Sequence, residues 1–150
     1  MRFDLPEART LVYEMLIPIR WGDMDAMQHV NNASYFRYFE TVRLEWMHSI
    51  GAAGDPAREG PAMVNAFCNF IKQLTFPGQV LARHFVAGVG RTSFDTYMTL
   101  ERADEPGVVY ANGGATLVWV DYKAQKSAPL PDALRAVLAP REPPARAPSG

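Results

Sequence analysis

The sequence predicts an α+β domain in which one long helix lies against one curved antiparallel sheet. Three features indicate this: one long segment has apolar residues at helical spacing, the second half alternates like strands, and turn residues separate its segments. With 150 residues, 48% of them hydrophobic, the chain can fill one core but hardly a second. We therefore expect a single domain over residues 1–138 and a Pro-rich, disordered tail over residues 139–150.

Composition and charge exclude several broad classes of function. The chain has 15 Lys and Arg against 16 Asp and Glu, so its net charge is −1 and no basic field favours nucleic acid. No apolar run reaches the roughly 18 residues of a membrane-spanning helix. The single cysteine, Cys68, cannot form an intrachain disulfide, and the N-terminus lacks a signal segment. We expect a cytoplasmic protein that binds neither nucleic acid nor a membrane.

The first half of the chain predicts a strand, an ordered loop and the long helix. Residues 10–20 are rich in β-branched and aromatic side chains, which favours a strand. Residues 21–32, WGDMDAMQHVNN, follow neither periodicity, as is typical of an ordered loop. Residues 33–50 carry an apolar stripe at helical spacing. One of the two asparagines before the helix can cap its start, and Gly51 can end it.

The second half predicts four further strands and a short terminal helix. After a turn-rich segment, the predicted strands cover residues 62–74, 80–90, 93–102 and 108–122. The third of them alternates apolar and polar residues, as expected where one sheet face is buried. In the last, Ala111, Gly113 and Ala115 are small residues that would let another element approach closely. Residues 132–138 are expected to form a short helix.

The loop before the long helix gathers several potentially reactive polar residues. Backbone N–H groups in the first turn of a helix lack intrahelical acceptors, and the helix dipole favours negative charge there. An oxyanion formed at this position would be stabilised, and a carboxylate a few residues upstream could act on the same substrate carbon. Taken alone, an Asp in such a loop more often serves as a turn or cap residue.

The segment IPIRWGDMDAMQHVNNASYFRYFETVRLEWM resembles the signature of hotdog-fold acyl-CoA thioesterases of the 4-hydroxybenzoyl-CoA thioesterase type. The segments GVGRTSF and GGATLVWVDYKAQKSAPLP also resemble this family, so the similarity covers residues 12–138. The resemblance implies a hotdog fold, in which a curved five-stranded antiparallel sheet wraps a long central helix. It also implies hydrolysis of an acyl-CoA thioester to a carboxylic acid and CoA, without a metal or other cofactor.

Matched to this family, the catalytic carboxylate is Asp25, the second aspartate of GDMD. Asp25 would attack the thioester carbonyl as a nucleophile, or activate as a general base the water that does so, and both roles stay open. The backbone N–H near Asn32, at the helix start, would polarise the carbonyl. His29 would carry a proton or orient water, with a ring bonded to backbone as an equal alternative. Asp23 is interpreted as structural.

The resemblance assigns the segment GRTSF, between two predicted strands, to the CoA moiety. The residues that would contact CoA are Gly90, Arg91, Thr92 and Ser93. CoA phosphates need backbone donors and cations, which this segment supplies. An equal alternative is a plain turn with a solvated arginine. Phe67, Phe70 and Met63 could line the acyl pocket or be ordinary core.

Other reactive side chains are interpreted as structural. Glu40, on the long helix, is a competing catalytic acid, but an ion pair with Arg37 or Arg43 fits its position at least as well. Cys68 lies in an apolar strand and is expected to be a small hydrophobe rather than a nucleophile. No G-x-S-x-G element supports serine catalysis. Two aspartates in DMD are a weak metal signal, so no metal is expected.

The resemblance also implies a homodimer or homotetramer, because such domains pair their sheets edge to edge and build active sites at the subunit interface. Pairing would also remove an exposed sheet edge. Two alternatives to hydrolysis of a small-molecule acyl-CoA stay open. The chain could act on thioesters of acyl carrier protein, or be a non-catalytic acyl-CoA-binding module of the same fold.

Overall fold

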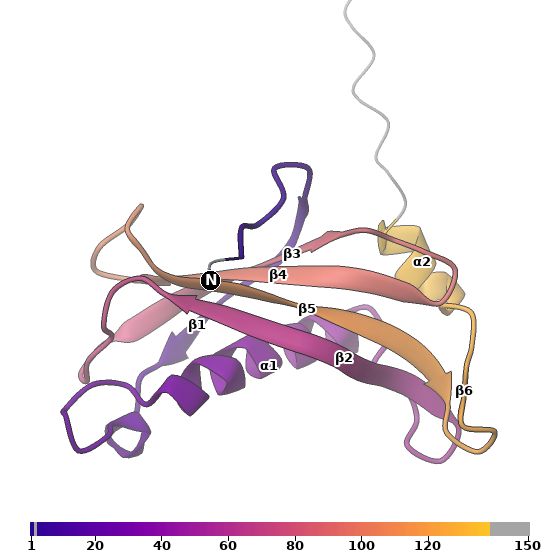
Figure 1. Cartoon of the computed structure of the whole chain (residues 1–150), viewed down its shortest axis with the longest axis horizontal. Helices are drawn as coiled ribbons and strands as arrows, with labels where there is room; N and C mark the ends of the chain where they lie inside the picture. Colours follow the sequence, from indigo (N-terminus) through magenta and orange to yellow (C-terminus); the bar gives the residue numbers. More distant parts are fainter. Residues whose placement is uncertain (2, 139–150) are drawn as a thin grey trace, which may run out of the picture.

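One long helix lies against a curved antiparallel sheet, which is the predicted hotdog arrangement (Figure 1). A computed structural model describes residue 1 and residues 3–138, and the predicted tail over residues 139–150 lies outside these residues. The helices are η1 (Trp21–Asp23, a 3-10 turn), α1 (Asn32–Ser49) and α2 (Asp132–Leu138). The strands are β1 (Thr10–Pro18), β2 (Glu59–Phe70), β3 (Gln79–Ala87), β4 (Ser93–Arg102), β5 (Val109–Asp121) and β6 (Lys126–Ser127).

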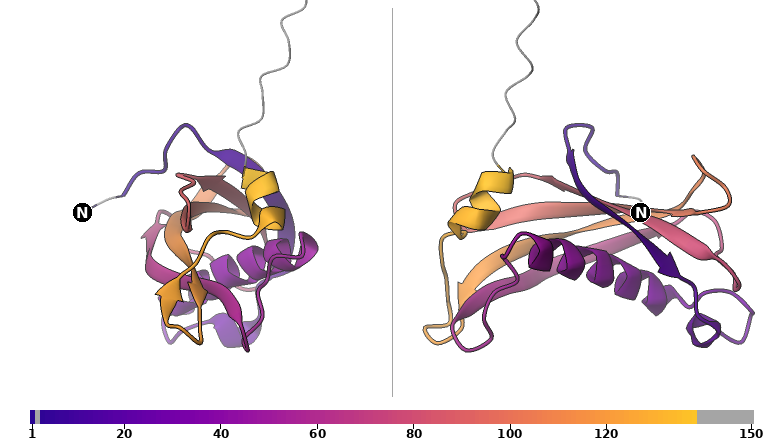
Figure 2. Two further views of the ribbon diagram at one scale, coloured as in Figure 1. Left: turned by 90° about the vertical axis from the view of Figure 1, so that its right-hand side faces the viewer. Right: turned by 180° about the vertical axis from the view of Figure 1, so that it is seen from behind.

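The strands of the main sheet run antiparallel in the order β1-β3-β4-β5-β2. β1 and β2 are therefore its two edges. β6 pairs with the end of β5 and adds a sixth strand to the five that were predicted, because two residues are too few to show alternation in a sequence. Figure 2 shows the sheet curving around α1, which covers one of its faces.

α1 forms where the sequence predicted it, because its apolar residues lie on one face. The buried face holds Tyr35, Tyr38, Phe39, Val42, Arg43, Trp46 and Met47. Asn31 is the residue that caps the helix, since its side chain accepts the Ala33 N–H at 2.9 Å. Gly51 follows the other end with a φ of 69°, the left-handed conformation that favours glycine.

The core lies between α1 and the concave face of the sheet. In β4, Phe94, Met98 and Leu100 are buried and face the helix. Gly113 of β5 lies directly under α1, because a Cβ there would come within 2.6 Å of the Phe39 ring. The small residues predicted on this strand therefore allow the helix to approach the sheet closely.

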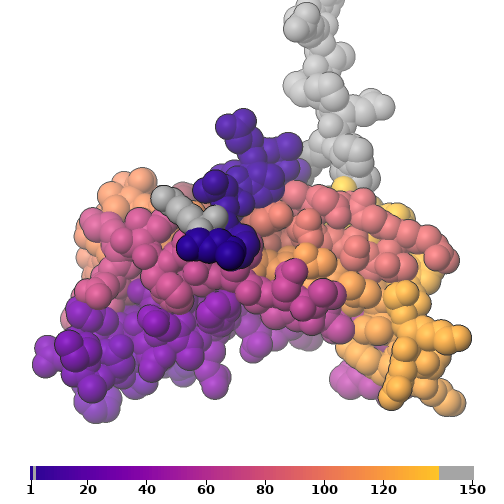
Figure 3. Space-filling model, in the orientation of Figure 1, coloured from indigo at the N-terminus to yellow at the C-terminus, as the bar shows by residue number. Residues whose placement is uncertain are grey.

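The outer face of the sheet carries the N-terminal segment, which crosses it in Figure 3. The ring of Phe3 packs on that of Phe67 with 5.2 Å between centroids, and Asn69 donates to the Phe3 carbonyl at 2.6 Å. The helices formed by residue 1 and residues 3–138 include none that is long and apolar enough to span a lipid bilayer.

β2 ends at Phe70, four residues before the predicted end. The N–H groups of Ile71 and Lys72 both donate to the Tyr110 carbonyl, at 3.0 and 2.9 Å, and the chain leaves the sheet there. Leu74 is fully buried, so the apolar pattern continues past the strand. The segment of residues 71–78, here called the β2–β3 connection, packs instead against the loop before α1.

Candidate active site

Asp25 lies in the loop between η1 and α1, in a tight turn that holds its carboxylate. Oδ1 of Asp25 accepts the N–H groups of Met27 at 2.9 Å and His29 at 3.3 Å, which is an Asx-type turn. Gln28 closes this turn with a φ of 62°, an uncommon conformation for a residue with a side chain. Among the described residues these bonds engage only Oδ1, so Oδ2 is available to a substrate or water.

The start of α1 offers one backbone donor beside this carboxylate. The first N–H groups of a helix have no intrahelical acceptor. Asn31 takes two of them, because its side chain accepts the Ala33 N–H at 2.9 Å and its carbonyl accepts the Ser34 N–H at 2.8 Å. Within the part of the chain that the structure describes, the Asn32 N–H is left without an acceptor.

The three predicted catalytic residues border one surface depression of about 480 Å³, here called the polar depression. Its lining includes Asp25, His29, Asn32, Tyr35, Phe70 and Lys72. The structure thus brings Asp25 together with the free amide of Asn32, and it places Phe70 nearby as one of the three predicted pocket residues. The half-buried His29 ring makes no hydrogen bond among the described residues. These residues therefore give no support to the alternative in which the ring is bonded to the backbone.

Asp25 also borders a second depression of about 620 Å³, here called the apolar depression. It is lined by Trp21, Gly22, Met24, Asp25, Gln28, Thr75 and Phe76. Trp21 is 77% exposed and Phe76 43% exposed. Asp25 therefore stands between an apolar surface on one side and the helix N-terminus on the other.

Asp23 supports the loop from below, which is the structural role that the sequence predicted. It is buried, and its Oδ2 accepts the Tyr38 hydroxyl at 2.8 Å and the Arg20 N–H at 2.9 Å. Burial of Tyr38 raises the pKa of its hydroxyl, and the hydrogen bond to Asp23 raises it further. Tyr38 therefore stays protonated and keeps donating to Asp23.

Cys68 and Glu40 do not contribute a nucleophile or acid to this site. Burial raises the pKa of the Cys68 thiol to about 12, so it is protonated at neutral pH, as expected of a small hydrophobe. Glu40 is exposed, and among the described residues it forms no ion pair, so the predicted pairing with Arg37 or Arg43 is wrong. The reason is that Arg43 faces the sheet and is buried, where burial lowers its pKa.

The predicted CoA residues form the turn between β3 and β4, far from Asp25 in the same chain. Gly90 donates to the Ser93 carbonyl at 2.8 Å, and the Arg91 carbonyl accepts the Leu130 N–H at 3.0 Å. The strand register shows how far apart they are. Phe70, which lines the same depression as Asp25, pairs with Ala111 of β5, and Ala111 in turn pairs with Leu100 of β4. Ser93 lies seven residues before Leu100 on β4, about 23 Å away along an extended strand. This turn lies beside α2, at the opposite end of α1 from the Asp25 loop (Figure 1).

The sequence did not predict that the β2–β3 connection packs against the loop that carries Asp25. The Val30 N–H donates to the Leu74 carbonyl at 2.9 Å, and the Leu74 N–H donates to the Tyr35 hydroxyl at 3.2 Å. Burial raises the pKa of Tyr35, and the charge of Asp25 contributes a smaller increase. The turn signal TFPGQ marks a break in the strand but not the partner on which it packs.

Over residue 1 and residues 3–138, no three His, Cys, Asp or Glu side chains gather closely enough to hold a metal ion. The expectation of metal-free chemistry stays a prediction.

Comparisons with known proteins show the family and the fold. The family model of the thioesterase-like superfamily matches residues 19–138. The PA2801 protein of Pseudomonas aeruginosa, a candidate thioesterase, is 34% identical with a TM-score of 0.81, over 85% of this chain and 98% of that chain. A candidate acyl-CoA thioesterase from Xanthomonas campestris is 31% identical with a TM-score of 0.69, over 75% and 96% of the two chains.

A more distant structure shares the fold alone. It is Slr0204, a 1,4-dihydroxy-2-naphthoyl-CoA thioesterase from Synechocystis, which is 15% identical with a TM-score of 0.77, over 84% and 94% of the two chains. A search of curated protein sequences gives no significant match.

The hotdog fold, the family match over residues 19–138 and the similar thioesterase structures place the chain among thioester hydrolases. The chain belongs to the thioesterase-like superfamily.

Proposed function

We propose that this protein hydrolyses acyl-CoA thioesters to a free carboxylic acid and CoA. One observation carries the proposal: the Asp25 carboxylate and the unbonded Asn32 N–H border the same depression. The name of the Xanthomonas structure, which specifies an acyl-CoA substrate, supports the choice of CoA.

The Asn32 N–H would donate to the thioester carbonyl oxygen, where the helix dipole also favours the negative charge of the tetrahedral intermediate. Asp25 would then act in one of two ways. As a nucleophile it bonds to the carbonyl carbon, CoA leaves as the thiolate, and water hydrolyses the resulting anhydride. As a general base it takes a proton from water, whose oxygen attacks the carbon directly, and the tetrahedral intermediate then breaks its C–S bond and releases CoA as the thiolate. His29, which lines the same depression, would carry a proton to the leaving sulfur.

Lys72 supplies a cation for the phosphate-bearing part of CoA. It borders the polar depression, and its Nζ lies 5.2 Å from the centre of the Tyr110 ring, a cation–π contact. An ammonium in this position favours a ligand that brings phosphates as well as a thioester.

We also propose that two copies pair through β2. This strand is an edge of 12 residues on which Met63 and Val64 are 48% and 63% exposed, and such an edge is normally covered. Antiparallel pairing about a two-fold axis would lay the start of one β2 beside the end of the other. The turn at residues 90–93 of a second copy would then face Asp25, about three strand spacings or 15 Å from β2. The CoA residues and Asp25 would meet across subunits rather than within one chain.

The proposal is tested by thiol release from a panel of aliphatic and aromatic acyl-CoAs. Asp25→Ala is expected to lower kcat by about 10²-fold or more, the range of a lost general base. Asp55→Ala is the matched control, because Asp55 makes the same kind of turn with the Ala57 N–H, at 2.9 Å, in a different loop. Equal turnover by wild type and Asp25→Ala would remove Asp25 from the chemistry.

The same assay separates the alternatives. If the protein hydrolyses thioesters of acyl carrier protein but not those of CoA, acyl carrier protein is the carrier of its substrate. Tight acyl-CoA binding by a folded protein without any turnover would instead indicate a binding module.

A further inference from the structure

The β2–β3 connection borders both depressions beside Asp25. Ile71 and Lys72 line the polar depression, and Thr75 and Phe76 line the apolar one. A displacement of this segment would therefore change both sides of the site together.

The loop that carries Asp25, with the chain just before it, docks on this connection through three contacts, two between backbone groups and one from a backbone N–H to a side-chain sulfur. Besides the Val30 N–H bond to the Leu74 carbonyl, the Phe76 N–H points to Met24 Sδ at 3.3 Å. The Ile19 N–H, just before the loop, donates to the Gly78 carbonyl at 2.8 Å. The contacts lie on both sides of Asp25 in the sequence, so the connection acts as the base of the loop.

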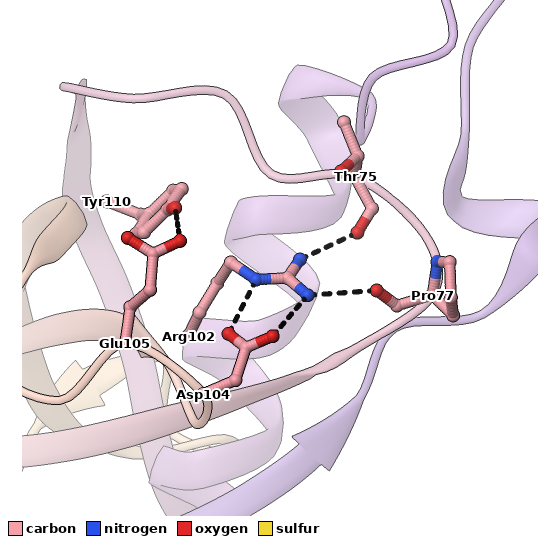
Figure 4. Close-up of polar contacts among 6 residues, drawn as sticks. All are labelled: Thr75, Pro77, Arg102, Asp104, Glu105 and Tyr110. Carbon is pink, nitrogen blue, oxygen red and sulfur yellow. Dashed lines mark hydrogen bonds and ion pairs between the residues drawn. The ribbon is translucent and has the colours of Figure 1, made fainter.

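Arg102, the last residue of β4, holds the connection from the opposite side (Figure 4). Its Nη1 donates to the Thr75 carbonyl at 2.9 Å, and its Nη2 donates to the Pro77 carbonyl at 3.0 Å. Nε and Nη2 bind the two carboxylate oxygens of Asp104 at 2.9 and 3.1 Å. The Arg102 side chain is 13% exposed, and the N–H donors of its guanidinium are largely engaged.

Two further features show that this contact is built closely. A Cβ on Gly78 would lie 2.5 Å from Arg102 Nη2, so the guanidinium rests against a backbone that has no side chain. The bidentate bond to Asp104 fixes the plane of the fork and turns its outer donors toward the two carbonyls. A lysine could not reach both carbonyls and the carboxylate, since its donors radiate from one atom.

The same turn after β4 supplies a second anchor. Tyr110 accepts the N–H groups of Ile71 and Lys72 on its carbonyl, and its hydroxyl donates to Glu105 at 2.6 Å (Figure 4). Asp104 and Glu105 thus hold, through Arg102 and Tyr110, the two ends of the β2–β3 connection.

We propose that Arg102 is a positioning residue for thioester hydrolysis, which fixes the β2–β3 connection and, through it, the loop of Asp25. The inference rests on the proposed function. Arg102 lines neither depression, so its effect passes through the carbonyls of Thr75 and Pro77. Misplacing a catalytic group by about 1 Å can cost 10²-fold in rate, which sets the scale of the effect.

The test compares wild type with Arg102→Ala, Arg102→Lys and the matched control Arg9→Ala. Arg9 also donates to a carbonyl, that of Pro6 at 2.7 Å, but lies over Phe85 on the outer face of the sheet. Arg102→Ala is expected to lower kcat about 10- to 100-fold with a much smaller change in KM. Arg102→Lys should recover only part of kcat, and Arg9→Ala should stay within about twofold of wild type.

Amide hydrogen exchange gives a readout that does not need turnover. The Val30 and Phe76 amides should exchange faster in Arg102→Ala than in wild type or Arg9→Ala, at a temperature where all three are folded. If Arg102→Ala does not fold, turnover and amide exchange are measured on Arg102→Lys and Asp104→Asn instead.

An unchanged kcat together with unchanged exchange at these amides would overturn the role of Arg102. A wild type that hydrolyses no thioester would overturn the proposed function instead, while the exchange comparison would still decide whether Arg102 holds the loop.

Discussion

His84 should make the folded protein sensitive to mild acid. Its ring is fully buried on β3, edge-on to Trp46 with 4.7 Å between centroids. Neither ring nitrogen has a hydrogen-bond partner among the described residues. Burial, together with the charge of Arg43, lowers the pKa of His84 to about 3. Unfolding would return the ring to water, where the pKa of histidine is about 6.5.

The sign of the effect follows from proton binding. Between the two pKa values the unfolded chain binds a proton that the folded chain does not, so the free energy of unfolding falls as the pH drops from 6.5 towards 3. Above that window the contribution of His84 is constant. At 1.36 kcal/mol per pKa unit, the loss amounts to about 2 kcal/mol between pH 7.5 and pH 5.

Urea unfolding at these two pH values measures the effect in wild type, His84→Phe and His48→Gln. His84→Phe keeps an aromatic ring against Trp46 but cannot bind a proton. His48 is exposed on α1, so His48→Gln should lose as much stability as wild type. We expect wild type to lose about 2 kcal/mol more than His84→Phe. Equal losses in these two proteins would refute the reasoning.

Two further predictions concern the site. If Asp25 and the turn of residues 90–93 meet across subunits, refolding an equal mixture of Asp25→Ala and Arg91→Ala should restore about a quarter of wild-type activity. The reason is that half of the dimers would contain one copy of each variant, and each of these would keep one of its two sites intact. Activity no higher than that of the two variants refolded separately would contradict this arrangement. Because the Cys68 thiol has a pKa of about 12, Cys68→Ala should keep kcat/KM within about twofold, and a tenfold loss would give the thiol a role.

The two aspartates of DMD show how position separates neighbouring carboxylates. Asp23 points inward, where Tyr38 and a backbone N–H satisfy one of its oxygens. Asp25 points to the surface, with one oxygen in a turn and the other open to the depressions. A general base or nucleophile needs an accessible lone pair, and Asp25 is the one of the two that has it.

The sequence by itself determined the local structure and the family. Periodicity and capping residues predicted α1 and its ends, and alternation predicted the main strands, because both signals depend on neighbours a few residues apart. The GDMD and HVNN motifs placed Asp25 and Asn32 on either side of one loop. The structure confirms that they share a depression, since the short loop leaves them little room to separate.

The tertiary structure decided which distant residues meet. The apolar pattern of residues 71–74 suggested more strand, but Leu74 is buried under the Asp25 loop, which no local pattern records. Glu40 had helical neighbours suited to an ion pair, but Arg43 turned inward because its face of α1 lies on the sheet. Arg102 reaches the site only because β4 ends beside the β2–β3 connection. Strand order and loop docking depend on pairing between segments far apart in the chain, and such pairing leaves no periodicity in one sequence.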